Sequence, residues 1–114
     1  MLPRRLEGLP TTVLAADAVI HEASTVSSRL LGLAWLRELP SGHALFIPDC
    51  RSIHSFGMRF PIDVAFVDES AATIRIERAL PPRRVLVERT AFAVIESRAG
   101  EIARFVNRGP RSVG

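Results

Sequence analysis

The sequence predicts a mainly β fold, a small antiparallel β-sandwich or barrel-like domain with one or two short helices. Many short apolar runs are separated by proline, glycine and charged turns, a spacing that favours an all-β domain over a βαβ arrangement. Residues 73–80 alternate apolar and polar side chains, as a strand with one solvated face does. Six or more strands with little helix are therefore expected.

The length and composition predict one domain spanning residues 1–114. Hydrophobic residues make up 47% of the chain, which is enough to bury a real core, and we expect only about the first ten residues to be loosely ordered. The single cysteine excludes an internal disulfide. No apolar stretch is long enough to span a bilayer, and the opening residues do not read as an export signal. We therefore expect a soluble, cytoplasmic protein.

Three apolar segments in the first two thirds of the chain predict strands. Residues 11–20 are apolar on both alternating faces, as in a single buried strand. Residues 43–48 form a strand that Pro48 ends, and residues 62–68 form another that begins after Pro61.

Residues 24–36 fit a short helix better than a strand. Ser24 or Thr25 is the expected N-cap, and Val26, Leu30 and Leu33 recur at helical spacing. Glycine at position 32 weakens this prediction.

The last third predicts a turn, three strands and one helical turn. The turn covers residues 68–71, and in the next strand Ile74, Ile76 and Leu80 should share one face. The remaining segments, listed in order, are a short edge strand within residues 83–88, a strand within residues 91–100 and a helical turn within residues 101–106.

The stretch from Cys50 to Asp63 places a cysteine, His54 and Met58 at four-residue intervals. On an extended strand, positions four apart lie roughly 13 Å from each other. Zinc holds its ligands at about 2.0–2.3 Å, so these side chains cannot share a metal or form a nucleophile and base pair without residues from other strands. A helix would bring them together, but Pro48, Gly57 and Pro61 argue against one.

Two interpretations of this stretch remain open from its residues. In the first, Cys50, Phe56 and Met58 face the core and His54 is hydrogen-bonded at its edge, because free cysteine and methionine are commonly buried. In the second, the stretch lines a ligand pocket. We expect no bound metal and no cofactor.

Asp63 stands alone in an otherwise apolar strand and needs a partner if it is buried. Arg59, an N–H group of a neighbouring loop and the His54 imidazole are the candidates. A structural salt bridge or cap is favoured over a general base. Asp49 and Asp68 are expected to be turn residues.

Charge is uneven along the chain. Residues 1–74 hold six arginines and eight carboxylates, whereas residues 75–114 hold nine arginines and four carboxylates. Clusters such as Arg83 and Arg84 suit phosphate, but six Phe, one Trp and no Tyr offer little stacking surface for nucleic acid.

The motif His-x3-Met-x4-Asp, formed by His54, Met58 and Asp63, resembles the signature of domain-of-unknown-function family 192, a set of small, mainly bacterial and archaeal proteins. The resemblance extends from about residue 12 to residue 109 and includes the Gly-Leu pair at residues 32–33 and the strand end at residues 96–100. It implies an all-β, sandwich-like fold and no established activity.

The chain departs from that family at several positions. Ala34 stands where members often carry methionine, and Arg59 lies in a run where many have Met-Lys-Asn. Gly109-Pro110 replaces the usual Gly-Asp, which weakens any role for a carboxylate there. Some members are exported behind a signal or lipid anchor, which we do not expect here.

Three functions remain open. We favour a non-enzymatic module that binds a small molecule or a protein in a pocket formed by five residues: Cys50, His54, Met58, Arg59 and Asp63. A small hydrolase-like enzyme using His54 with Asp63 is the second hypothesis, although no catalytic motif supports it. A nucleic-acid accessory protein using the arginine-rich half is the third.

Overall fold

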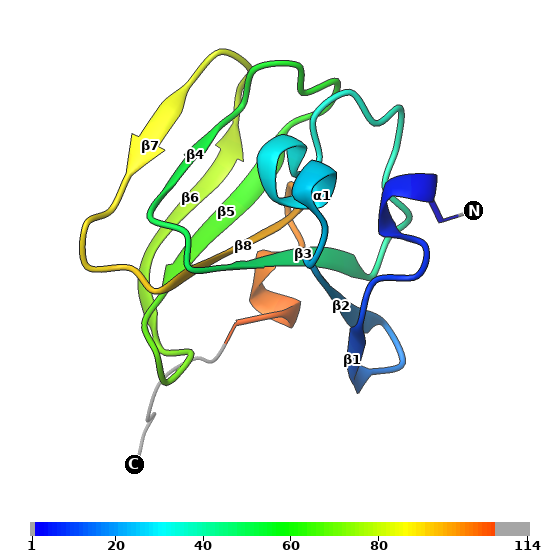
Figure 1. Cartoon of the computed structure of the whole chain (residues 1–114), viewed down its shortest axis with the longest axis horizontal. Coiled ribbons are helices and arrows are strands. Elements are labelled where there is room, and N and C mark those ends of the chain that lie inside the picture. The colour runs from blue at the N-terminus through cyan, green and yellow to red at the C-terminus, as the bar shows by residue number, and fades with distance from the viewer. Residues whose placement is uncertain (1, 107–114) are drawn as a thin grey trace.

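A six-stranded sheet forms the centre of the computed structural model, which describes residues 2–106 (Figure 1). In chain order the elements are η1 (Arg4–Leu6), β1 (Thr11–Ala15), β2 (Ala18–Glu22), α1 (Val26–Leu31), β3 (His43–Pro48), β4 (Ser52–His54), β5 (Ile62–Val67), β6 (Thr73–Leu80), β7 (Val85–Val87), β8 (Ala93–Arg98) and η2 (Ile102–Arg104). Strands hold 41% of the described residues and helices 11%, so the predicted mainly β class is confirmed.

The large sheet has the strand order β1-β2-β3-β8-β5-β6, and β4 pairs with β7 in a separate two-stranded sheet. All neighbours are antiparallel except β2 and β3. A parallel pair needs a crossover connection, and here the segment containing α1 supplies it. Within residues 2–106 the sheet stays open and does not close into a barrel.

The large sheet is covered on both faces. Leu45, Val64 and Val94 face a larger apolar cluster that also contains Ile53 of β4 and Leu33 after α1. Residues on the opposite face, including Ala65 and Ile95, pack against Ile102 and Phe105. Alternate residues of the central strands therefore enter different cores, and this explains why those strands are apolar at almost every position.

Most of the predicted elements are confirmed. Strands occur at 43–48, 62–67, 73–80, 85–87 and 93–98, and the helical turn occurs at 102–104. The predicted turn after β5 also forms, because the Asp68 carboxylate accepts hydrogen bonds from the N–H groups of Ser70 and Ala72.

The single strand predicted for residues 11–20 was wrong. The segment is a hairpin in which β1 turns back into β2 at Ala16 and Asp17, and every residue of β1 is exposed. The Ala-Asp pair lacks the glycine or asparagine that usually marks a two-residue turn. Without that turn signal, the apolar edge strand β1 and the following strand β2 were interpreted as one buried strand.

The predicted helix begins at its expected N-cap but buries a different face. The Thr25 hydroxyl accepts from the N–H of Ser28, and the Ser28 hydroxyl accepts from the N–H of Thr25, which completes a capping box. Val26 and Leu30 are 75% and 68% exposed, whereas Leu33 is buried beyond the end of the helix. Helical spacing did not predict the buried face because the helix ends at residue 31.

The alternation predicted for β6 fails near the end of the strand. Val64 pairs with Glu77 but Ile62 pairs with Leu80, so β6 bulges between these pairs, where Ala79 has φ of 49°. The bulge turns Leu80 into the larger core, away from the side taken by Ile76.

Residues 2–10, which belong to the segment expected to be loosely ordered, contribute to the larger core. Leu6 and Leu9 are buried, and the Arg5 guanidinium donates hydrogen bonds to the carbonyls of Gly32 and Ala34. Across residues 2–106 there is no helix with the length and apolar character needed to cross a membrane.

Candidate functional site

The end of α1 forms one wall of a pocket. Gly32 ends the helix with φ of 55° and ψ of −125°, a backbone conformation that glycine adopts without steric cost. This turn sends Leu33 into the core and brings the Leu33 N–H to the carboxylate of Glu96.

Glu96 forms the floor of the pocket. It lies on β8, between β3 and β5, and pairs with Leu45 and Val64 on its two sides. Because side chains alternate along a strand, Glu96 shares the face of Val94 and points toward the larger core. It is only 3% exposed.

The carboxylate of Glu96 is poorly compensated. Burial raises its pKa from 4.5 to about 7, and the Leu33 N–H opposes this rise only in part. Among the described residues, no hydrogen-bond partner reaches Glu96 Oε1. A Cβ atom at Gly32 would lie 2.7 Å from that oxygen, so glycine is what leaves room for the carboxylate.

Cys50 lies in the connection between β3 and β4 and is half-buried. Its thiol donates a hydrogen bond to the Ser52 carbonyl, with an Sγ–O distance of 3.0 Å. Burial raises the pKa of the thiol, and the nearby charges of Glu96 and Arg29 act in opposite directions. The thiol is therefore a weak nucleophile here, because the thiolate is the reactive form.

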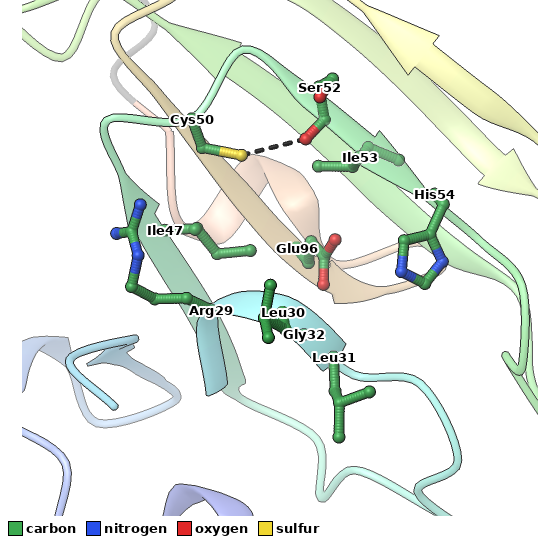
Figure 2. A pocket seen from close by; sticks show the side chains of 10 residues that line it. All are labelled: Arg29, Leu30, Leu31, Gly32, Ile47, Cys50, Ser52, Ile53, His54 and Glu96. Carbon is green, nitrogen blue, oxygen red and sulfur yellow. Dashed lines mark hydrogen bonds between the residues drawn. The ribbon is translucent and has the colours of Figure 1, made fainter. Parts of the chain in front are cut away.

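The pocket has a volume of about 200 Å³ and lies between the end of α1 and the strand that carries Ser52 to His54 (Figure 2). In this view Cys50 and His54 lie toward opposite ends of the pocket, with the Glu96 carboxylate between them. Its lining comprises Arg29, Leu30, Leu31, Gly32, Ile47, Cys50, Ser52, Ile53, His54 and Glu96.

The structure gathers two of the five predicted pocket residues, Cys50 and His54, in this pocket. Met58 is 7% exposed in the larger core and lines a separate hollow with Trp35 and Phe56. Phe56, predicted to face the core, is 49% exposed because the chain leaves the strand after His54 and turns at residues 56–57.

Asp63 lies on the opposite face of the sheet from the pocket. Its carboxylate accepts hydrogen bonds from the backbone N–H groups of Ala79, Gly100 and Ile102, at 2.8, 2.8 and 3.3 Å. Loop N–H groups, one of the three candidate partners, therefore satisfy it. Arg59 is exposed, and neither it nor His54 bonds to this carboxylate.

The sequence interpretation did not select Glu96, although a signal was present. Like Asp63, it is a carboxylate in an apolar strand, and it falls on the same alternating face as buried Val94. The polar residues after it made the segment look like a strand end leaving the core. Arg29, Leu30 and Leu31 were also missed as pocket residues, since their position depends on how α1 crosses the sheet.

Groups of three or more His, Cys, Asp or Glu side chains placed to hold a metal do not occur in the part of the chain that the structure describes. The other buried polar atom without a partner there is His21 Nδ1, whose ring pairs through Nε2 with His43 Nδ1 at 2.9 Å. Burial and the nearby His43 lower the pKa of His21.

Several arginines of the basic half are already paired. Arg75 forms ion pairs with Glu77 and Glu88, and Arg98 and Arg104 approach Glu101. These pairs reduce the free positive charge of the segment.

A family model described as DUF192, uncharacterized ACR, matches residues 11–110. The chain belongs to this family. The Glu96 pocket therefore lies within the DUF192 domain, and the resemblance inferred from the motif is confirmed with nearly the predicted limits. No curated protein matches the sequence.

Two solved structures share the DUF192 fold seen here. A protein of unknown function from Novosphingobium aromaticivorans has a TM-score of 0.69 and 23% identity, covering 91% of this chain and 84% of its own. A Sinorhizobium meliloti protein provisionally described as a transcription regulator has a TM-score of 0.67 and 19% identity, covering 76% and 73%. At these identities the likeness shows the fold alone.

Proposed function

We propose that the protein is a non-enzymatic binding module and that the Glu96 pocket holds a small ligand. One observation carries the proposal. Glu96 is only 3% exposed and lines the pocket, and its oxygen Oε1 has no hydrogen-bond partner among the described residues. A buried polar group without a partner costs about 1–3 kcal/mol, and more when it is charged. A ligand that donates a hydrogen bond would offset this cost.

The lining of the pocket suits binding. Leu30, Leu31, Ile47 and Ile53 give it apolar walls, and Glu96 places a carboxylate between them. Ligand sites commonly combine such walls with a small number of placed polar groups. At about 200 Å³, the pocket is smaller than the roughly 300–1,000 Å³ that encloses a drug-sized molecule.

The same groups give little support to catalysis. The Cys50 thiol donates to a backbone carbonyl instead of to a base, and its raised pKa keeps it protonated. The Asp63 carboxylate is held by three N–H groups on the other face of the sheet, away from His54. A binding function therefore requires fewer rearrangements than a hydrolytic one.

The test is a two-dimensional ¹⁵N–¹H NMR titration with three probes on one branched carbon skeleton: 3-methylbutylamine, 3-methylbutanol and 3-methylbutanoate. Binding of at least one probe should shift the amides of Gly32, Ile53 and Glu96 in a saturable way. Shifts by none of the three would overturn the proposal.

The single thiol provides the control. Methyl methanethiosulfonate caps Cys50 with a methylthio group, which should fill part of the pocket and abolish the shifts. Cys50→Ala treated with the same reagent cannot be capped and should still bind. Equal binding by capped and uncapped protein would place the probe elsewhere.

A further inference from the structure

We infer that the ligand of this pocket is a small amphiphilic cation, an ammonium or amidinium group on a short apolar chain, and that the Glu96 carboxylate pairs with its charge. The inference rests on the proposed function, because it names the chemical class of ligand for the same site. It depends on three features of the pocket: the free oxygen, the apolar walls and the remaining charges.

The free oxygen calls for a donor. One N–H, from Leu33, serves the carboxylate, and Oε1 is left without any partner among the described residues. A charged donor compensates a buried carboxylate better than a neutral one, since it adds the attraction between opposite charges, which is stronger in a site shielded from water. A cationic nitrogen therefore gains more at this atom than an alcohol of the same shape.

The apolar walls of the pocket favour a ligand that carries a hydrocarbon group next to its charge. Ile47 and Ile53 are buried, whereas Leu30 and Leu31 are 68% and 37% exposed on the pocket rim. Covering the two leucines removes apolar surface from water, which stabilises the complex by about 25 cal/mol for each Å² buried. A bare inorganic cation would leave this surface exposed.

Three other charged or titratable side chains line the pocket: Arg29, Cys50 and His54. None of them adds a second negative charge, and none adds a buried positive charge that would already neutralise Glu96. Arg29 of α1 is exposed, and its guanidinium donates to the Pro48 carbonyl at 2.7 Å. The Cys50 thiol is protonated, as its raised pKa indicates, and His54 of β4 is exposed. Glu96 is thus the only buried charge among the described lining residues, and a ligand of opposite charge matches it.

The test uses the three probes of the NMR titration, now as a comparison of affinities. At pH 8 the amine should bind at least about tenfold more tightly than the alcohol, because only the amine brings a charge opposite to that of the carboxylate. The carboxylate probe should bind more weakly than both. In Glu96→Gln the preference for the amine should disappear.

The pH dependence is the second readout. With a Glu96 pKa of about 7, the affinity for the amine should fall by up to about thirtyfold from pH 8 to pH 5.5, towards the affinity of the alcohol, as the carboxylate is protonated. His54 also lines the pocket, so His54→Gln is the control for the contribution of its imidazole. The ratio of affinities at the two pH values should persist in His54→Gln and vanish in Glu96→Gln.

The outcomes separate the two proposals. Binding of the alcohol or the carboxylate without a preference for the amine would overturn the inference and leave the binding function standing. A preference for the amine that survives in Glu96→Gln would also overturn it. Failure of all three probes to bind would remove the proposed function as well.

Discussion

Two buried carboxylates on adjacent strands, Asp63 of β5 and Glu96 of β8, have opposite hydrogen-bonding environments. They lie on opposite faces of the sheet and are 0% and 3% exposed. Asp63 accepts hydrogen bonds from three backbone N–H groups, whereas Glu96 keeps one oxygen without a partner among the described residues. The two carboxylates are therefore equally buried and differ in their hydrogen bonds. Asp63, whose bonds are complete, is a structural carboxylate, whereas Glu96, which lacks a partner, is a candidate binding group.

The largest effect is expected when the structural carboxylate is removed. Asp63→Ala leaves the N–H groups of Ala79, Gly100 and Ile102 without their acceptor in a buried site. The free energy of unfolding should fall by about 4 kcal/mol, measured by urea denaturation.

Asp68→Ala is the matched control, because this carboxylate also accepts backbone N–H groups but lies in an exposed turn. Its loss should be much smaller. Equal losses of unfolding free energy in the two variants would mean that the buried hydrogen bonds to Asp63 stabilise the fold no more than the exposed ones to Asp68.

The second effect has the opposite sign. The folded pKa of Glu96 is raised, so ionisation costs stability as the pH rises from 4.5, and the full penalty is present above about pH 7. Glu96→Gln removes this penalty and should be more stable than wild type by about 3 kcal/mol at pH 8, with little difference at pH 4.5. Urea denaturation at the two pH values measures this.

Glu101→Gln supplies the contrast for that variant. Burial alone would raise the Glu101 pKa, but the Gly42 N–H, the Ser41 hydroxyl and the charges of Arg104 and Arg98 hold it below its usual value. This carboxylate therefore stabilises the fold above its unfolded pKa, and the variant should lose stability at pH 8. A gain would contradict the distinction between satisfied and unsatisfied carboxylates.

The smallest effect is expected from alanine substitutions at two glycines, Gly32 beside Glu96 and Gly100 beside Asp63. Gly32 and Gly100 both have positive φ, at 55° and 90°, so alanine should cost about 1–3 kcal/mol at either. A Cβ atom at Gly32 would lie 2.7 Å from Glu96 Oε1, but one at Gly100 meets nothing within 4 Å. Gly32→Ala should therefore displace the carboxylate and shift its NMR titration, whereas Gly100→Ala should leave that titration unchanged.

Local patterns predicted the strands but not how they associate. The run from Ile62 to Val67 follows Pro61 and is apolar at every position but one, which is enough to place a buried strand. The parallel pairing of β2 with β3 depends on contacts distant in sequence, and no local pattern encodes it. The bulge at Ala79 likewise appears only once β6 is paired with β5.

The candidate site was predicted in part. A lone carboxylate in an apolar strand drew attention to Asp63, and the loop N–H groups named among its partners do hold it. The same pattern occurs at Glu96, but the polar residues that follow concealed it. Cys50 and His54 could be selected by residue type, whereas their meeting with Glu96 depends on the crossover through α1.

The central claim is that the Glu96 carboxylate is buried without adequate compensation in an open pocket. A ¹³C NMR titration of the Glu96 side-chain carboxyl carbon tests it most directly. The structure predicts a midpoint near pH 7 in the free protein, because burial raises the pKa to about 7. A midpoint near the usual value of 4.5 would show a solvated or fully paired carboxylate and contradict the account.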